Sequence, residues 1–103
     1  MTPQQVRELV EQQISGQWDR SNLHGVDLRT CLLDPQLTKC IDAGTGQPVD
    51  LWVVLSEAPG NTSCYGVAYD ERSKVFGLVE FNPDLPPVLV GMYGGFLETM
   101  EAM

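Results

Sequence analysis

Residues 64–81 read CYGVAYDERSKVFGLVEF, and this stretch decides the fold. Two runs rich in β-branched and aromatic residues flank a short polar turn, a pattern typical of a β-hairpin. If Tyr69 faces Phe76 across the hairpin, Tyr65 faces Glu80 in the same register. Strands joined by so short a turn are antiparallel, so the stretch predicts an antiparallel sheet.

The second face of this hairpin carries small residues before larger ones: Gly66, Ala68 and Gly77, then Val79 and Phe81. Small side chains allow another element to come close to the sheet. We therefore expect a helix to cover this face.

The segment before the hairpin predicts further strands. Residues 51–55 are apolar on both sides, which favours a central strand covered on both faces. Residues 56–63 read as a longer exposed turn. Residues 26–33 and 37–43 indicate a first hairpin around Asp34, Pro35 and Gln36, in which Arg29 pairs with Asp42 and Cys31 lies across from Cys40.

Helices are predicted at both ends of the chain. Thr2 and Gln5 form a capping box around Pro3. The apolar stripe that follows is Val6, Leu9, Val10, Ile14 and Trp18. The helix is expected to end between Ile14 and Arg20. Near the other terminus, residues 88–90 predict a short strand and residues 96–103 a short helix.

These elements predict an α+β fold. We expect a mainly antiparallel sheet of about five to six strands, flanked by an N-terminal and a short C-terminal helix in two layers. At 103 residues, the chain is the size of a single compact domain spanning 1–103.

Charge narrows the classes of partner. The net charge is -8, and residues 75–103 carry four acids and no Lys or Arg. A binder of nucleic acid or of an anionic membrane needs clustered cations, so neither partner is expected. No apolar run is long enough to span a bilayer, and the first residues lack a signal-peptide pattern, so we predict a cytoplasmic protein.

Few residues offer chemistry. His24 with a cysteine is the one nucleophile–base combination, and nothing in the sequence orients the ring. Cys31 and Cys40 are a candidate redox pair through a reversible cross-strand disulfide. The glycines of residues 91–96 lack the Lys-Ser/Thr of a phosphate-binding loop. We predict no catalytic residue, no cofactor and no metal site.

The leading hypothesis is a non-enzymatic acidic protein-interaction domain. An acidic surface suits a basic protein partner, as for an inhibitor or an immunity-type protein. In general outline the chain resembles small bacterial proteins, including the immunity proteins that neutralise toxins, and that resemblance assigns no residue. The predicted interaction residues are Glu80, Asp84, Tyr93, Glu98 and Glu101.

Two alternatives remain open. One is a small-molecule-binding protein or minor enzyme with a cleft near Tyr93, Gly94 and His24. The other is a homo-oligomeric structural protein, such as a homodimer. It follows if both helices cover the small-residue face and leave an apolar patch exposed. That patch would comprise Tyr65, Val67, Tyr69, Phe76 and Leu78.

Overall fold

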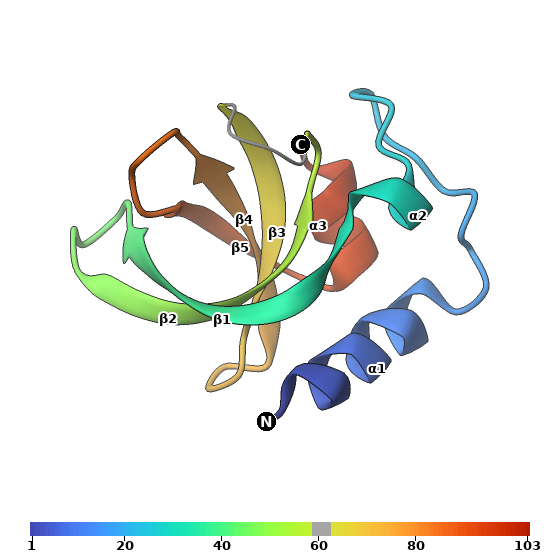
Figure 1. Ribbon diagram of the computed structural model, residues 1–103, viewed down its shortest axis with the longest axis horizontal. Coiled ribbons are helices and arrows are strands. Elements are labelled where there is room, and N and C mark those ends of the chain that lie inside the picture. The colour runs from blue at the N-terminus through green and yellow to red at the C-terminus, as the bar shows by residue number, and fades with distance from the viewer. Residues whose placement is uncertain (59–62) are drawn as a thin grey trace.

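The computed structural model describes residues 1–58 and 63–103, and its strands form a five-stranded barrel with helices on one side (Figure 1). The predicted turn over 56–63 lies partly outside the described residues. The elements, in chain order, are α1 (Pro3–Ile14), α2 (Leu28–Cys31), β1 (Leu32–Asp42), β2 (Pro48–Ser56), β3 (Cys64–Asp70), β4 (Val75–Phe81), β5 (Val88–Gly94) and α3 (Phe96–Glu101).

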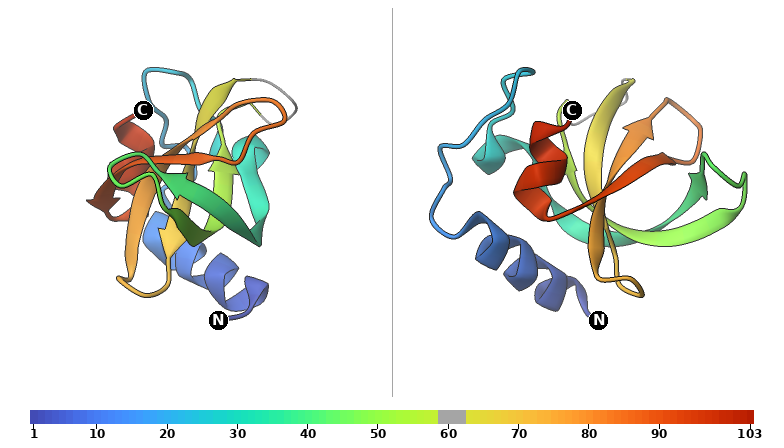
Figure 2. Two further views of the ribbon diagram at one scale, coloured as in Figure 1. Left: turned by 90° about the vertical axis from the view of Figure 1, so that its left-hand side faces the viewer. Right: turned by 180° about the vertical axis from the view of Figure 1, so that it is seen from behind.

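The α+β fold with an antiparallel sheet and a helix at each end is confirmed. The sequence did not indicate that the sheet closes on itself. β1 and β5 pair in parallel through Ile41 with Val88 and Asp42 with Leu89. Figure 2 shows the curled sheet from two further sides, with the helices beside it. Closure removes part of the edge that an open sheet would expose.

Two apolar clusters hold the barrel and its helices together. The inner cluster fills the barrel and contains Cys40, Leu51, Val53, Ala68, Val79 and Leu89. The outer cluster joins the outside of the sheet to the helices, with Val6, Val10 and Ile14 of α1 and Phe96 and Met100 of α3 among its members. Alternate residues of β2 enter the two clusters, so the central strand predicted at residues 51–55 is confirmed.

The register predicted for the hairpin at residues 64–81 is confirmed, with Tyr69 opposite Phe76 and Tyr65 opposite Glu80. The prediction that a helix covers its small-residue face is wrong, because Ala68 and Val79 on that face line the barrel interior. A Cβ atom on Gly66 would lie 2.2 Å from the carbonyl oxygen of Leu55. Small residues are needed here because strands, rather than a helix, approach closely.

The helices instead cover the opposite face of the hairpin. Val67, Tyr69 and Phe76 are buried in the outer cluster, and the Phe76 ring meets the Phe96 ring of α3 edge-on at 5.7 Å between centroids. The exposed apolar patch that suggested a homo-oligomer is therefore largely covered within one chain.

The hairpin predicted around residues 34–36 is wrong. Residues 28–31 form a helical turn, capped by the Asp27 side chain, which accepts hydrogen bonds from the Arg29 backbone N–H and the Thr30 hydroxyl. β1 then runs without a turn through Pro35. Its pairing with β2 shifts register between Leu32 and Gln36. Proline has no N–H to donate to a ladder, and such an irregularity accommodates it.

The start of α1 is as predicted. The Thr2 hydroxyl accepts from the Gln5 N–H, and the Gln5 side chain accepts from the Thr2 N–H. The helix ends at Ile14, where Ser15 takes a left-handed conformation with φ 49°. Among the described residues, none of the helices has the length and apolar character required to cross a membrane.

Candidate interaction surface

The structure gathers some of the predicted interaction residues around β5. Glu80 lies on β4 opposite Val88, the first residue of β5, and Tyr93 lies near the other end of β5. Glu98 is in the first turn of α3, and its carboxylate covers Gly95, 3.1 Å from where a Cβ atom on that glycine would stand. Three of the five predicted residues thus border one strand.

The other two residues lie apart. Asp84 is exposed in the loop before β5 and takes a left-handed conformation with φ 62°. Glu101 ends α3 and forms an ion pair with Arg20, so its charge is already partnered.

Two bulges in β5 decide which way Tyr93 points. Leu89 pairs with Val79 and Gly91 with Leu78, which leaves Val90 as an extra residue. A further register shift, between Phe76 and Gly77, leaves Tyr93 as a second extra residue. One extra residue reverses the faces of the residues that follow it.

The contacts of β5 show this reversal. The Met92 sulfur lies above Gly77, on the inner side with Leu89, whereas the Tyr93 ring lies across Gly91 on the outer side. Without the bulge at Val90, Tyr93 would share the inward face of Leu89. The bulge leaves Tyr93 44% exposed, next to Met92 at 42% and Val90 at 47%.

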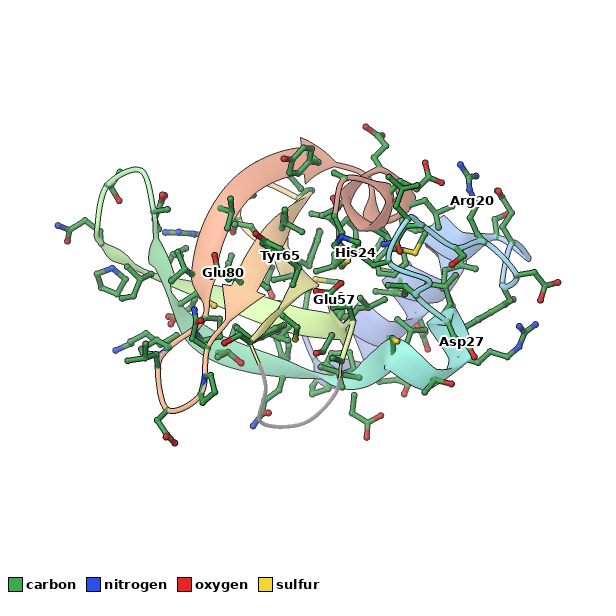
Figure 3. The ribbon with its side chains drawn as sticks, turned by 90° about the horizontal axis from the view of Figure 1, so that it is seen from above. Arg20, His24, Asp27, Glu57, Tyr65 and Glu80 are labelled. Carbon is green, nitrogen blue, oxygen red and sulfur yellow. The ribbon has the colours of Figure 1, made fainter. Side chains whose placement is uncertain are left out.

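We call the outside of this part of the barrel the outer β3–β5 face. It consists of Tyr65, Leu78, Glu80, Val88 and Tyr93. Tyr65, Glu80 and Val88 pair in one row across the three strands, and buried Leu78 lies in the next row, opposite Gly91. Seen from above, Tyr65 lies between Glu80 on one side and His24 with Glu57 on the other (Figure 3).

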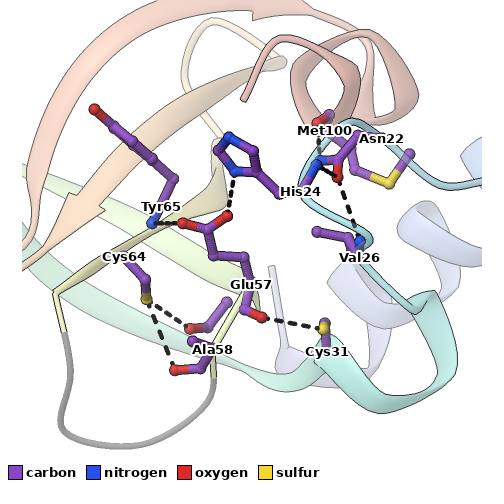
Figure 4. A network of polar contacts seen from close by, with 10 residues as sticks. Asn22, His24, Val26, Cys31, Glu57, Ala58, Cys64, Tyr65 and Met100 are labelled. Atoms are coloured by element: carbon purple, nitrogen blue, oxygen red, sulfur yellow. Dashed lines mark hydrogen bonds and ion pairs between the residues drawn. The ribbon is translucent and has the colours of Figure 1, made fainter.

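Glu57, just after β2, links this face to the loop that carries His24 (Figure 4). Its Oε1 accepts a hydrogen bond from the Tyr65 backbone N–H at 2.8 Å, and its Oε2 lies 2.5 Å from His24 Nδ1. The Glu57 side chain is only 16% exposed. The His24 ring lies 6.5 Å from the Tyr65 ring, centroid to centroid.

The charge around this face is one-sided. None of the six Lys and Arg residues belongs to β3, β4, β5 or α3. Arg20 and Arg29 are engaged with Glu101 and Asp19. The outer β3–β5 face and its border therefore present Glu57, Glu80 and Glu98 without a permanent cation among them.

The cysteines do not form the predicted pair. Cys31 ends α2 in the outer cluster, and its thiol points to the Glu57 carbonyl at 3.6 Å. Cys40 lies in the inner cluster opposite Val49 of β2. The hairpin that set Cys31 across from Cys40 is absent, because Cys31 is the last residue of α2 and Cys40 lies near the far end of β1. All three cysteines are free and buried.

Two surface hollows lie away from the predicted cleft. One, of about 420 Å³, has Trp52 in its lining, and the other, of about 330 Å³, includes Trp18 and Arg29. Neither is lined by Tyr93, Gly94 or His24. Within the described part of the chain, no group of three or more His, Cys, Asp or Glu residues is placed to hold a metal ion.

Sequence reasoning missed Glu57, and it assigned His24 to a cleft with Tyr93 and Gly94 and Tyr65 to the apolar patch of a homo-oligomer. The pairing of Tyr65 with Glu80 was available from the hairpin register. The contact of His24 with Glu57 joins two loops 33 residues apart, and no periodic pattern signals it. Comparisons with protein-family models, with curated proteins and with solved structures found no match to this chain.

Proposed function

We propose that this chain is a non-enzymatic acidic interaction domain that binds a basic protein, in the manner of an inhibitor or immunity-type protein. The observation that carries the proposal is the bulge at Val90, which turns Tyr93 to the same outer side of the barrel as Glu80. Bulges often occur where a side chain must be re-aimed for function.

The composition of this face supports a protein partner. Tyrosine is enriched at protein interfaces because it combines a large apolar ring with a polar tip. Tyr93 adds exposed apolar surface to this face, and Val90 and Met92 at neighbouring positions of β5 are also exposed. An interface with an apolar centre and a charged rim has this character.

The charge supports a basic partner. With a net charge of -8, the chain attracts a cationic protein at long range and repels acidic ones. Glu80 on the outer β3–β5 face, with Glu57 and Glu98 at its border, would then select the docking orientation, because no cation belongs to the strands that form this face.

The test is association with basic proteins from the native host at low and high salt. Screening shortens the range of charge attraction from about 30 Å at 0.01 M salt to about 3 Å at 1 M. We expect basic proteins to bind the wild type at low salt and to be lost from a Tyr93→Ala, Glu80→Gln double variant. A Glu8→Gln variant, at an exposed position of α1, loses the same single charge and should bind normally. Partners that are apolar and insensitive to salt would contradict the proposal.

We also propose a cytoplasmic location, which the three free, buried cysteines support. Disulfides are rare in the cytosol and common in secreted proteins. Trapping the thiols during isolation from the host should label three free cysteines after unfolding. A disulfide-linked form would contradict this location.

A further inference from the structure

One position on the outer β3–β5 face combines an aromatic ring with carboxylates on both sides. Glu80 lies directly across the β3–β4 ladder from Tyr65. Glu57 approaches Tyr65 from the other side, because the Tyr65 backbone N–H holds its carboxylate at 2.8 Å. Figure 3 shows this order, with the Tyr65 side chain in the middle.

The two carboxylates lack a permanent counter-ion. Within the described residues, the ion-pair partner of Glu57 is the His24 ring, which is charged only when protonated. Glu80 accepts a hydrogen bond from the Asn82 amide at 3.4 Å and has no cation within ion-pair distance in the described chain. A carboxylate as little exposed as that of Glu57 interacts more strongly with an incoming cation than a fully hydrated one.

The neighbouring residues suit a long side chain with an apolar stem. Tyr65 shares a row with Glu80 and half-buried Val88, whereas Tyr93 lies further along β5, past the row of Leu78 and Gly91. The stem of a long cationic residue can lie along Val88, which is half-buried opposite Glu80, while its charged end reaches the Tyr65 ring and Glu80.

We propose that the outer β3–β5 face binds an arginine side chain of the basic partner, with the guanidinium stacked on Tyr65 and paired with Glu80. This assignment rests on the proposed function and specifies its partner. The charge complementarity of the face selects a cation, and the ring selects its type. A planar guanidinium stacks on an aromatic face and pairs with a carboxylate through two N–H groups, whereas an ammonium does neither as well.

The test compares two peptides of equal length and charge, one of alternating Gly and Arg and one of alternating Gly and Lys. Calorimetry and NMR titration at low salt, near pH 8 where an ordinary histidine is largely neutral, measure their affinities. We expect the Arg peptide to bind about fivefold more tightly, in line with cation–π and bidentate pairing. The backbone amides of Tyr65 and Glu80 should shift on binding.

Variants separate the arginine site from general charge attraction. Tyr65→Leu should reduce the affinity for the Arg peptide to that for the Lys peptide, and Tyr65→Phe, which keeps the ring, should retain the preference. Glu80→Gln should weaken binding of the Arg peptide, whereas Glu8→Gln on α1 should not. Circular dichroism of each variant checks that it folds, and if Tyr65→Leu does not fold, Glu80→Gln tests the site in its place.

The outcomes distinguish the two proposals. Equal affinity for both peptides, unchanged in Tyr65→Phe and Glu80→Gln, would overturn the arginine site and leave a basic partner in place. Failure of both peptides to bind at low salt would overturn both. Dimerisation of the free chain through this face, seen by light scattering, would also overturn the arginine site, since a second copy would then cover it.

Discussion

The sulfur atom of Met92 lies 2.7 Å from the point where a Cβ atom on Gly77 would stand. This contact fixes the inner side of β5 against β4 and so helps to keep Tyr93 on the outer side. The space exists only because Gly77 has no side chain. The orientation of the proposed interaction surface therefore depends on a glycine inside the barrel.

Replacing Gly77 by alanine should destabilise the fold. The new methyl group would also lie 2.9 Å from the Gly91 carbonyl oxygen, a backbone atom that cannot withdraw without disturbing the β4–β5 ladder. We expect a loss of about 1–3 kcal/mol in the free energy of unfolding, as for other overpacked cores. Urea denaturation measures it. In the control, Gly44→Ala, the methyl group meets only the Asp42 side chain at 3.3 Å, and stability should change little. Equal stability of the two variants would show that the contact is not tight.

From the contacts of Glu71 we predict that the fold loses stability at acid pH. Its Oε1 accepts hydrogen bonds from the Met1 ammonium at 2.8 Å and from Trp52 Nε1 at 3.2 Å, and these contacts lower the pKa of Glu71. Because the pKa of Glu71 is lower in the folded state, its carboxylate stabilises the fold at pH values above the ordinary pKa of a glutamate. This stabilisation is lost as the pH falls through the pKa of Glu71 in the folded state. Glu71→Gln should be less stable than the wild type near pH 7 and equal to it near pH 2.

Urea titrations at both pH values test this prediction. Glu11→Gln, an exposed acid on α1, is the matched control and should not change the difference between neutral and acid stability. Because Glu71 is exposed, the effect should be small. A Glu71→Gln variant with the same pH dependence as the wild type would show that these contacts do not favour the carboxylate.

Cys40 predicts a loss of stability at alkaline pH. Burial in the barrel, followed by the charge of Asp50, raises the pKa of its thiol from 9.0 to about 11. The folded state keeps the proton more tightly than the unfolded chain, so this contribution is complete below pH 9 and is lost as pH rises towards 11. Between about pH 8 and pH 10.5, it should remove about 2 kcal/mol from the free energy of unfolding.

The Cys40→Ala variant isolates this effect. It should be less stable than the wild type at pH 8 because it leaves a cavity, yet lose less stability on the way to high pH. Burial also raises the pKa of Tyr69, with help from Glu71 and Asp70, and that contribution is common to both proteins. Parallel pH curves for the two proteins would show that the Cys40 thiol does not titrate as described.

Regular segments were predictable from the sequence, because local patterns determine them. The capping box at Thr2 and Gln5 identified the start of α1. The hairpin register followed from unbroken alternation, which aligned Tyr69 with Phe76. In these places propensity, periodicity and tertiary packing favour the same structure.

Irregular segments were not predictable. Pro35 after an aspartate is typical of a turn, but a register shift accommodates it inside β1. Alternation shows that a strand has two faces and does not show which becomes concave, so the face of Gly66 and Gly77 was assigned to a helix instead of the barrel interior. Gly91 follows the bulge at Val90, and a glycine within a strand can mark a bulge. The predicted strand ended at residue 90, so the direction of Tyr93 did not follow from the sequence.

We predict that the hydrogen bonds of Asn22 hold the loop that carries His24 beside the outer β3–β5 face. Its Oδ1 accepts from the backbone N–H groups of His24 at 2.9 Å and Val26 at 3.3 Å, and its Nδ2 donates to the Met100 carbonyl of α3 at 2.7 Å. Asn22→Ala removes all three bonds and should cost about 1–3 kcal/mol, because the backbone groups lose their partner. Asn22→Asp keeps the acceptor but lacks the donor, so its stability should lie between that of the wild type and that of Asn22→Ala.

The position of His24 is a second readout. If Asn22 holds the loop in place, the alanine variant should lose the contact of His24 with Glu57, and the Tyr65 ring signals should shift in NMR spectra. A Ser73→Ala variant in the β3–β4 turn, at the far end of that hairpin from Tyr65, should leave them unchanged. Unchanged Tyr65 signals in Asn22→Ala would mean that Glu57 alone positions His24. The loop would then need no anchor on α3.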